Sequence, residues 1–211
     1  MKAKPSSPCA CRDTVPNPSI RLLTNSLKTA HYLVRETLND GSAATIRAAR
    51  PDDKERIVTA FLALGPRSIY ARFFHAKTEL SEQELRQLTE IDHESAVVLL
   101  ATIGAQPHEI VIGLGRYVAS GGSAEVAFVV ADDYAGRGIG GRLLDHLTHI
   151  ARENGLAKFE ADVLEDNAAM LAVFRDSGLP MTTTHADGIT HVTMLLCTDS
   201  REEPTSCDTS R

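Results

Sequence analysis

The sequence of 211 residues has no long hydrophobic run and no excess of positive charge. Its longest apolar run, Ala96 to Ile103, is far shorter than the roughly 20 residues that a transmembrane helix needs, so we expect no membrane span. The chain carries 22 Lys and Arg against 28 Asp and Glu, a formal charge of −6. Nucleic-acid-binding proteins draw most of their affinity from clustered basic side chains, so this balance argues against a nucleic-acid partner.

Cysteine is scarce and confined to the two ends of the chain. The four cysteines are Cys9, Cys11, Cys197 and Cys207. They provide no disulfide framework, and Cys9 and Cys11 lack a second pair of ligands at a spacing typical of zinc sites. His146 and His149 lack a third ligand and are expected at the surface, so we expect no metal. The N-terminus also lacks the apolar segment of a secretory signal, which together with the absence of a disulfide pattern predicts a cytoplasmic protein.

Proline and turn residues divide the chain into one folded domain and two tails. Four of the nine prolines lie in residues 1–31, which predicts a flexible N-terminal tail, although Ile20, Leu23 and Leu27 have the spacing of a short docked helix. Residues 198–211 predict a polar C-terminal tail. Residues 32–197 have the patterning of a single mixed α/β domain, and a hydrophobic fraction of 43% is enough for its core.

The hydrophobic patterns predict a hairpin, two helices, a three-stranded meander, a helix, a strand, a helix and a final hairpin. Capping boxes at Asp52 to Glu55 and at Ser81 to Glu84 indicate where the first two helices begin. Gly65-Pro66 indicates where the first helix ends. The other expected ranges are a hairpin at 32–48, strands at 95–103, 110–118 and 124–130, a helix at 138–153, a strand at 158–164, a helix at 168–177 and a hairpin at 182–196.

A glycine-rich turn joins the strand ending at Val130 to the helix that follows it. Its glycines are Gly136, Gly138, Gly140 and Gly141. Glycine lets backbone N–H groups approach an anion closely, and a helix N-terminus adds its own unpaired N–H groups, so the turn predicts a phosphate site. Arg137 and Arg142 place positive charge beside it.

Two alternatives are open for this turn. It matches the G-x-G-x-x-G dinucleotide fingerprint, and Glu160 and Asp162 follow at about the distance of a ribose-binding acid. That fingerprint begins almost directly after its strand, however, whereas here residues 131–135 intervene and the turn comes after a meander, which argues against a nicotinamide or flavin site. The other alternative is a turn that only caps a helix, but four glycines within six residues exceed what a cap needs.

Residues 134–144 resemble the pyrophosphate loop of the GNAT superfamily of N-acetyltransferases, whose pattern is Gln/Arg-x-x-Gly-x-Gly/Ala. The strand 124–130 and the segment 164–178 resemble the superfamily's central strand and its second CoA-binding segment. Five upstream segments resemble the bacterial branch that includes the protein lysine acetyltransferases, namely residues 38–41, 46–47, 50–53, 68–74 and 91–92. The resemblance covers residues 32–196 and implies a mixed, mostly antiparallel sheet with a central splayed strand, flanked by helices.

The resemblance implies that acetyl-CoA binds as co-substrate and donates its acetyl group to an amine. The backbone around Phe128, Val129 and Val130 would pair with the pantetheine arm. The turn would hold the pyrophosphate through Gly136, Arg137, Gly138, Ile139, Gly140 and Gly141. Asn167 would hydrogen-bond the opened backbone or the cofactor, and Phe174 would pack beside the thiol end.

Three positions depart from the family pattern. Ala135 stands where Gln or Arg is usual, Leu179 stands where Phe is common, and Phe174 lies where many relatives carry a tyrosine acid. The proton donor to the leaving thiolate is therefore unassigned. These departures keep a second hypothesis open, a non-catalytic module that binds acyl-CoA and regulates.

Glu125 is the candidate general base, because it is the one acid in the apolar strand that leads into the turn. A lysine ammonium has a pKa of about 10.4 and only the free amine attacks a thioester, so the enzyme must remove a proton. Alternation places Glu125 with Ala127 and Val129 on one face of the strand, where we expect it to be buried, as a base tuned toward the working pH requires. The matching position carries the base in several relatives. The alternative is a solvated glutamate at the end of a strand.

Tyr70, Arg72 and Asp92 are the candidates for recognition of the acceptor amine. In relatives the region of Tyr70 and Arg72 borders the acceptor site, whereas the spacing of Tyr70 and Phe73 by itself favours core packing. Asp92 lies in a polar cluster before a strand, where a solvated loop is the alternative. Within the class that the resemblance implies, a protein lysine is the favoured acceptor. The negative charge concentrated after residue 43 fits a cationic amine or a lysine-bearing partner. A small-molecule amine is the alternative, because acceptor specificity lies in loops.

Overall fold

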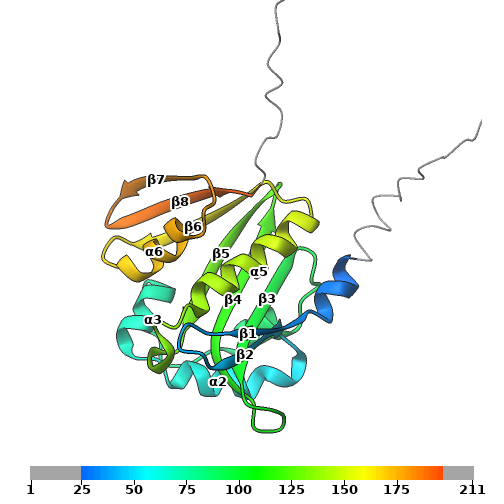
Figure 1. Ribbon diagram of the computed structural model, residues 1–211. Coiled ribbons are helices and arrows are strands. Elements are labelled where there is room, and N and C mark those ends of the chain that lie inside the picture. The colour runs from blue at the N-terminus through cyan, green and yellow to red at the C-terminus, as the bar shows by residue number, and fades with distance from the viewer. Residues whose placement is uncertain (1–24, 197–211) are drawn as a thin grey trace, which may run out of the picture.

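An eight-stranded sheet runs through the molecule in the order β1-β2-β3-β4-β5-β6-β8-β7 (Figure 1). The computed structural model describes residues 25–196, so the predictions made for Cys9, Cys11, Cys197 and Cys207 lie outside the described residues. The strands are β1 Leu33–Thr37, β2 Ala43–Ala48, β3 Ala96–Ile103, β4 Ile110–Ser120, β5 Ser123–Val130, β6 Lys158–Leu164, β7 Met181–Ala186 and β8 Ile189–Leu195. All neighbours are antiparallel except β5 and β6, which are parallel, so the predicted mixed and mostly antiparallel sheet is confirmed.

Helices cover both faces of the sheet. They are η1 Pro51–Asp53, α2 Lys54–Leu62, α3 Pro66–Phe73, α4 Glu82–Thr89, η2 Asp132–Tyr134, α5 Ile139–Glu153 and α6 Ala168–Asp176. The larger buried core joins the sheet to α5 and to Phe174 of α6, and a smaller core joins the opposite face to α2 and α4. Figure 1 shows α5 lying across β3, β4 and β5, with β6, β7 and β8 turned away from them.

The structure confirms most of the predicted elements and corrects three. Gly65-Pro66 ends no helix, because α2 stops at Leu62; instead Gly65 is the N-cap and Pro66 the first residue of α3, which the sequence analysis did not predict. The first capping box is also wrong: the backbone N–H of Arg50 donates to Asp53 Oδ2 at 2.9 Å, so Asp53 takes the role expected of Glu55. The third is residues 25–30, which fell within the predicted flexible tail but are helical, in a segment where the spacing of Leu27 had left a short docked helix open.

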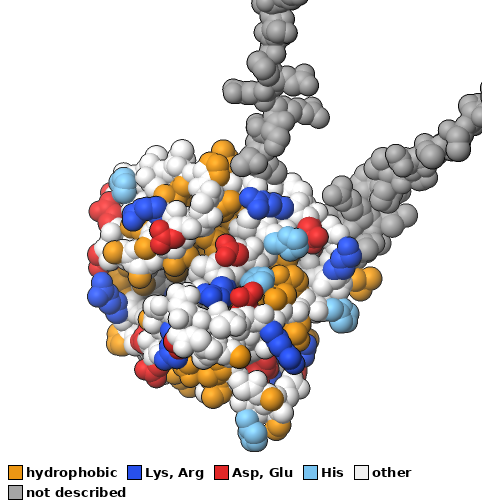
Figure 2. All heavy atoms as spheres, in the orientation of Figure 1, with side chains coloured by type: hydrophobic (Ala, Val, Ile, Leu, Met, Phe, Trp, Pro, Cys, Tyr) orange, Lys and Arg blue, Asp and Glu red, His pale blue; other side chains and the backbone are white. Residues whose placement is uncertain are grey.

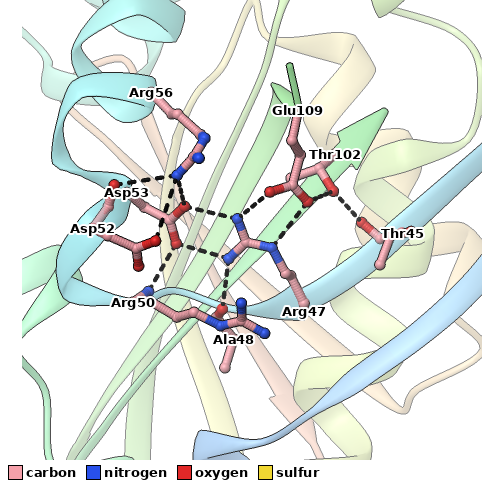
Figure 3. A network of polar contacts seen from close by, with 9 residues as sticks. All are labelled: Thr45, Arg47, Ala48, Arg50, Asp52, Asp53, Arg56, Thr102 and Glu109. Carbon is pink, nitrogen blue, oxygen red and sulfur yellow. Dashed lines mark hydrogen bonds and ion pairs between the residues drawn. The ribbon is translucent and has the colours of Figure 1, made fainter. Parts of the chain in front are cut away.

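A buried ion network anchors the start of α2 to the sheet (Figure 3). Arg47 of β2 is 2% exposed and donates to both carboxylate oxygens of Asp53, each at 2.7 Å. It also donates to Glu109 at 3.0 and 2.7 Å, and Thr102 donates to the same carboxylate at 2.7 Å. A buried arginine is costly unless its charge is paired, and two carboxylates satisfy this one. The network therefore fixes α2 against the face of the sheet that carries the candidate base.

Two glycines of β4 allow α5 to approach the sheet closely. A Cβ at Gly113 would lie 2.8 Å from Ile139 Cγ2, and a Cβ at Gly115 would lie 2.9 Å from the ring of Phe128. Such contacts are shorter than packed carbon atoms allow, so a larger residue would push the helix away. Because Ile139 is the first residue of α5, this packing sets the distance between the sheet and the glycine turn that precedes the helix.

Candidate active site

The strands β5 and β6 separate after Glu125. Their parallel register holds Ser123, Ala124 and Glu125 against β6 and then ends, whereas β5 stays paired with β4 as far as Val130. On its β6 side, the backbone of residues 126–130 therefore has no strand partner in the described part of the chain. Unpaired N–H and C=O groups of a strand can bind an extended ligand as an added strand. This open edge is what the predicted pairing of Phe128 to Val130 with the pantetheine arm requires.

A cleft of about 1680 Å³ follows the opening between the strands. It is lined by most of the residues that the sequence analysis singled out. These are Tyr70, Arg72, Glu125, Phe128, Val129, Val130, Gly136, Gly138, Ile139, Gly140, Gly141, Asn167 and Phe174. Of the predicted site residues, Arg137 and Asp92 do not line the cleft. Figure 2 shows acidic and basic side chains interspersed on the face that carries α5, so neither sign of charge dominates it.

The glycine turn has the backbone conformation of an anion cradle. Gly136 and Gly138 have φ angles of 76° and 81°, which disfavour any residue with a side chain, and Gly138 is the N-cap of α5. The first N–H groups of a helix lack intrahelical partners and carry its positive dipole end. Nothing lies within 4 Å of the Cβ position of Gly136 or Gly141, so the turn is open to a ligand.

The two arginines of the turn are engaged by the β1–β2 hairpin. Arg137 donates to Asp40 at 2.8 Å and lies 4.7 Å over the ring of Tyr134. Arg142 donates to the carbonyl oxygen of Thr37 at 2.5 Å and lies 3.4 Å from Glu36. Both side chains thus hold the turn in place. We had expected them to place positive charge beside a phosphate, and here that charge is paired within the protein.

Glu125 lies at the point where β5 and β6 part. The buried residues of β5 alternate with less buried ones, and Glu125 shares a face with Ala127 and Val129, as predicted. Its side chain is exposed in the cleft, so the expectation of burial is wrong. The reason is the separation of the strands, which leaves the side chain facing the cleft where a continuous sheet and its helices would cover it.

Asn167 and Phe174 are structural in this conformation. The side chain of Asn167 accepts a hydrogen bond from the backbone N–H of Met170 at 3.2 Å and so caps α6. Phe174 is 1% exposed and meets Phe128 edge to face, with ring centroids 6.1 Å apart. Phe174 therefore supports the strand that forms one wall of the cleft.

Tyr70 and Asp92, two of the candidates for acceptor recognition, lie in different places. Tyr70 is 50% exposed at the mouth of the cleft, so it is no core residue. Asp92 instead accepts hydrogen bonds from the backbone N–H groups of Ser95 and Ala96, which holds the turn before β3.

The expectation that His146 lies at the surface is wrong. Its side chain is largely buried and is hydrogen-bonded to the hydroxyl of Tyr32 at 2.5 Å.

Arg116 is a further candidate residue, beside the cleft, that the sequence patterns did not single out. It pairs in register with Ala127 and so lies on the Glu125 face of the sheet, where it lines a second cavity together with Arg72 and Glu125. An isolated charge in the apolar strand 110–120 is the same signal that identified Glu125, and it could have identified Arg116 too.

Within residues 25–196, no helix is both long and apolar enough to cross a membrane. The same residues contain no group of three or more His, Cys, Asp and Glu side chains placed to hold a metal ion.

Known proteins with the same fold and motifs identify the family. The sequence model described as acetyltransferase (GNAT) family matches residues 65–179. An acetyltransferase of Pseudomonas aeruginosa is 33% identical over 137 residues, which are 64% of this chain and 74% of that protein. Acetyltransferase Pat of Mycolicibacterium smegmatis is 37% identical over 128 residues, 59% of this chain, but the match spans only 38% of that longer protein.

Solved structures agree with the sequence comparisons. The GNAT domain of S. lividans PAT superposes with a TM-score of 0.71 at 34% identity, covering 77% of this chain and 96% of that one. A putative acetyltransferase from Salmonella typhimurium shares the fold at 22% identity, with a TM-score of 0.56, and its structure contains acetyl-CoA. Fold, glycine turn, split strands and matched sequence together show that this chain belongs to the acetyltransferase (GNAT) family, whose activity is acetyl-CoA-dependent acetyl transfer.

Proposed function

We propose that the protein transfers the acetyl group of acetyl-CoA to the side chain of a protein lysine, with Glu125 as general base. The observation that carries this proposal is the open edge of β5, which is followed along the chain by η2, the glycine turn and the N-terminus of α5. The edge offers backbone hydrogen bonds to the pantetheine arm, and the helix terminus offers N–H groups to the pyrophosphate. Glu125 lies at the closed end of this path, where the thioester would arrive.

The residues around the thioester position act mainly by orientation. The amine attacks the carbonyl carbon, the C–S bond breaks, and CoA leaves as the thiolate. Free backbone N–H groups of β5 would stabilise the charge that develops on the carbonyl oxygen, and holding both substrates in one cleft supplies the advantage of proximity. Glu125 takes the proton of the attacking ammonium, directly or through a water molecule, because its carboxylate is open to the cleft.

Three features support a protein lysine as acceptor. The relatives named Pat share 34% and 37% identity with this chain over the domain. The net charge of the chain is negative, which favours encounter with a cationic partner. Tyr70 stands half exposed at the mouth of the cleft, where an acceptor protein would make contact.

The test compares Glu125→Gln with Glu160→Gln, its neighbour in register on β6. Thiol release from acetyl-CoA with a lysine peptide should fall about 10²- to 10⁴-fold in kcat for Glu125→Gln, while the Kd for acetyl-CoA stays unchanged. Glu160 is ion-paired with Lys158 at 2.6 Å and does not line the cleft, so Glu160→Gln should keep full turnover. Unchanged kcat in Glu125→Gln would remove this residue from the mechanism. Tight CoA binding without any thiol release would instead favour the regulatory module.

A further inference from the structure

A second cavity, of about 240 Å³, lies between the sheet and the helices α2 and α4. Its walls are mostly apolar and include Ile57 and Phe61 of α2, Leu88 of α4 and Leu114 of β4. It meets the large cleft where Arg72, Phe73, Glu125 and Val129 line both. The cavity therefore opens beside the candidate base, on the face of the sheet opposite to α5.

Two arginines at this junction form no ion pair in the described part of the chain. Within residues 25–196, neither Arg72 nor Arg116 forms a hydrogen bond or an ion pair through its guanidinium, and Arg72 lies 5.1 Å over the ring of Phe73. Burial and the like charge of Arg116 lower the pKa of Arg72 to about 10, and the carboxylate of Glu125 opposes this shift. The buried Arg47, by contrast, is held by two carboxylates. A partly buried cation without an ion-pair partner favours a ligand that brings an anionic group to it.

Given the acetyl transfer proposed above, we propose that this junction and cavity form a second acceptor site, which binds an apolar α-amino acid. Its carboxylate would pair with Arg72 and Arg116, its side chain would fill the cavity, and its α-amine would face Glu125. In such a molecule the carboxylate, the apolar side chain and the amine are attached to one carbon atom, and the two arginines, the apolar walls and Glu125 line one cavity. The ε-amine of a lysine side chain has no carboxylate beside it and would leave both guanidinium groups unpaired.

The size of the cavity sets the side chains that fit. A dry protein cavity of about 150 Å³ is large enough to hold benzene, so one of about 240 Å³ accepts a side chain of the size of Leu or Phe. Glycine would leave the cavity empty, and the charged side chain of aspartate would be desolvated among apolar walls.

The reaction at this site balances as an ordinary acetyl transfer. The α-ammonium loses one proton to Glu125, the amine nitrogen forms a bond to the carbonyl carbon, and the C–S bond breaks. The second proton of the nitrogen goes to the CoA thiolate, and Glu125 returns its proton to solvent. The products are the N-acetylated amino acid and CoA with a free thiol.

Thiol release with L-leucine, L-leucinamide and a lysine peptide tests the proposal. L-leucine should be turned over, and L-leucinamide, which lacks the carboxylate, should have a kcat/KM at least about tenfold lower. Arg72→Gln should raise the KM for L-leucine about tenfold or more and abolish the preference for leucine over leucinamide. The matched control is Arg86→Gln, because the side chain of Arg86 on α4 is 62% exposed. This variant should keep the preference for leucine over leucinamide.

Direct binding gives a readout that does not depend on turnover. N-acetyl-L-leucine should raise the melting temperature of the wild type and of Arg86→Gln, but not that of Arg72→Gln. The proposal is overturned if leucinamide equals leucine, if Arg72→Gln leaves the KM for leucine unchanged, or if the lysine peptide alone is acetylated. In that last case the function proposed above stands. Acetyl-CoA binding without thiol release for any acceptor would refute the proposed transfer itself, and binding of N-acetyl-L-leucine would then show whether the pocket recognises the amino acid.

Discussion

Asp53→Asn should destabilise the protein by about 3 kcal/mol. The carboxylate of Asp53 is fully buried and accepts four hydrogen bonds, two from Arg47 at 2.7 Å, one from the N–H of Arg50 at 2.9 Å and one from Arg56 at 3.1 Å. Removing one partner of a buried ion pair costs about 3 to 5 kcal/mol. Glu109 remains paired with Arg47 in the variant, so we expect the lower end of that range.

Urea unfolding followed by circular dichroism measures this loss. With a denaturant slope of about 2 kcal/mol/M, the midpoint should fall by about 1.5 M without a change in slope. Asp52→Asn is the matched control, because the neighbouring carboxylate is 65% exposed and lies 3.8 Å from Arg56. That variant should lose less than about 1 kcal/mol. An Asp53→Asn variant no less stable than Asp52→Asn would refute the assignment of this network as the anchor of α2.

Two further predictions concern the glycine turn and the dependence of the free energy of unfolding on pH. Gly138→Ala should lower the melting temperature and weaken acetyl-CoA binding, because its φ of 81° costs a side chain about 1 to 2 kcal/mol and the new Cβ would lie 2.5 Å from Arg142 Nη1. Gly141→Ala, with open space around its Cβ, should not lose stability, and calorimetry showing equal melting for both variants would contradict this reading. Burial acts to raise the pKa of Asp53, but hydrogen bonds from Arg47 and Arg50 hold it below its usual range, and Arg47 likewise lowers the pKa of Glu109. Both groups thus stabilise the fold above their unfolded pKa values of about 4, so the free energy of unfolding should fall as the pH drops below about 4; a value unchanged between pH 7 and pH 3 would exclude this linkage.

The elements that sequence patterns predict well here are those whose signals are local. The alternation of buried and less buried residues predicted the strand around Phe128, and helical spacing of apolar residues predicted α5. The reciprocal hydrogen bonds of Ser81 and Glu84 are present as expected from the capping box. The helix α3 was missed because Gly65-Pro66 is compatible both with the end of one helix and with the start of the next. The side chain of Asp132 settles that choice, since it accepts a hydrogen bond from the N–H of Gly65 at 2.8 Å across 67 residues of sequence.

The sequence by itself indicated the glycine turn as a candidate phosphate site and Glu125 as the candidate base, because glycine spacing and a lone acid in an apolar strand are properties of neighbouring residues. The resemblance of its motifs indicated the family. The tertiary structure decided what surrounds them. The separation of β5 from β6 left Glu125 exposed, and the β1–β2 hairpin engaged Arg137 and Arg142. Packing of α2 and α4 on the opposite face created the cavity beside Arg72 and Arg116. Burial and charge pairing depend on segments far apart in the chain, so patterns of adjacent residues do not encode them.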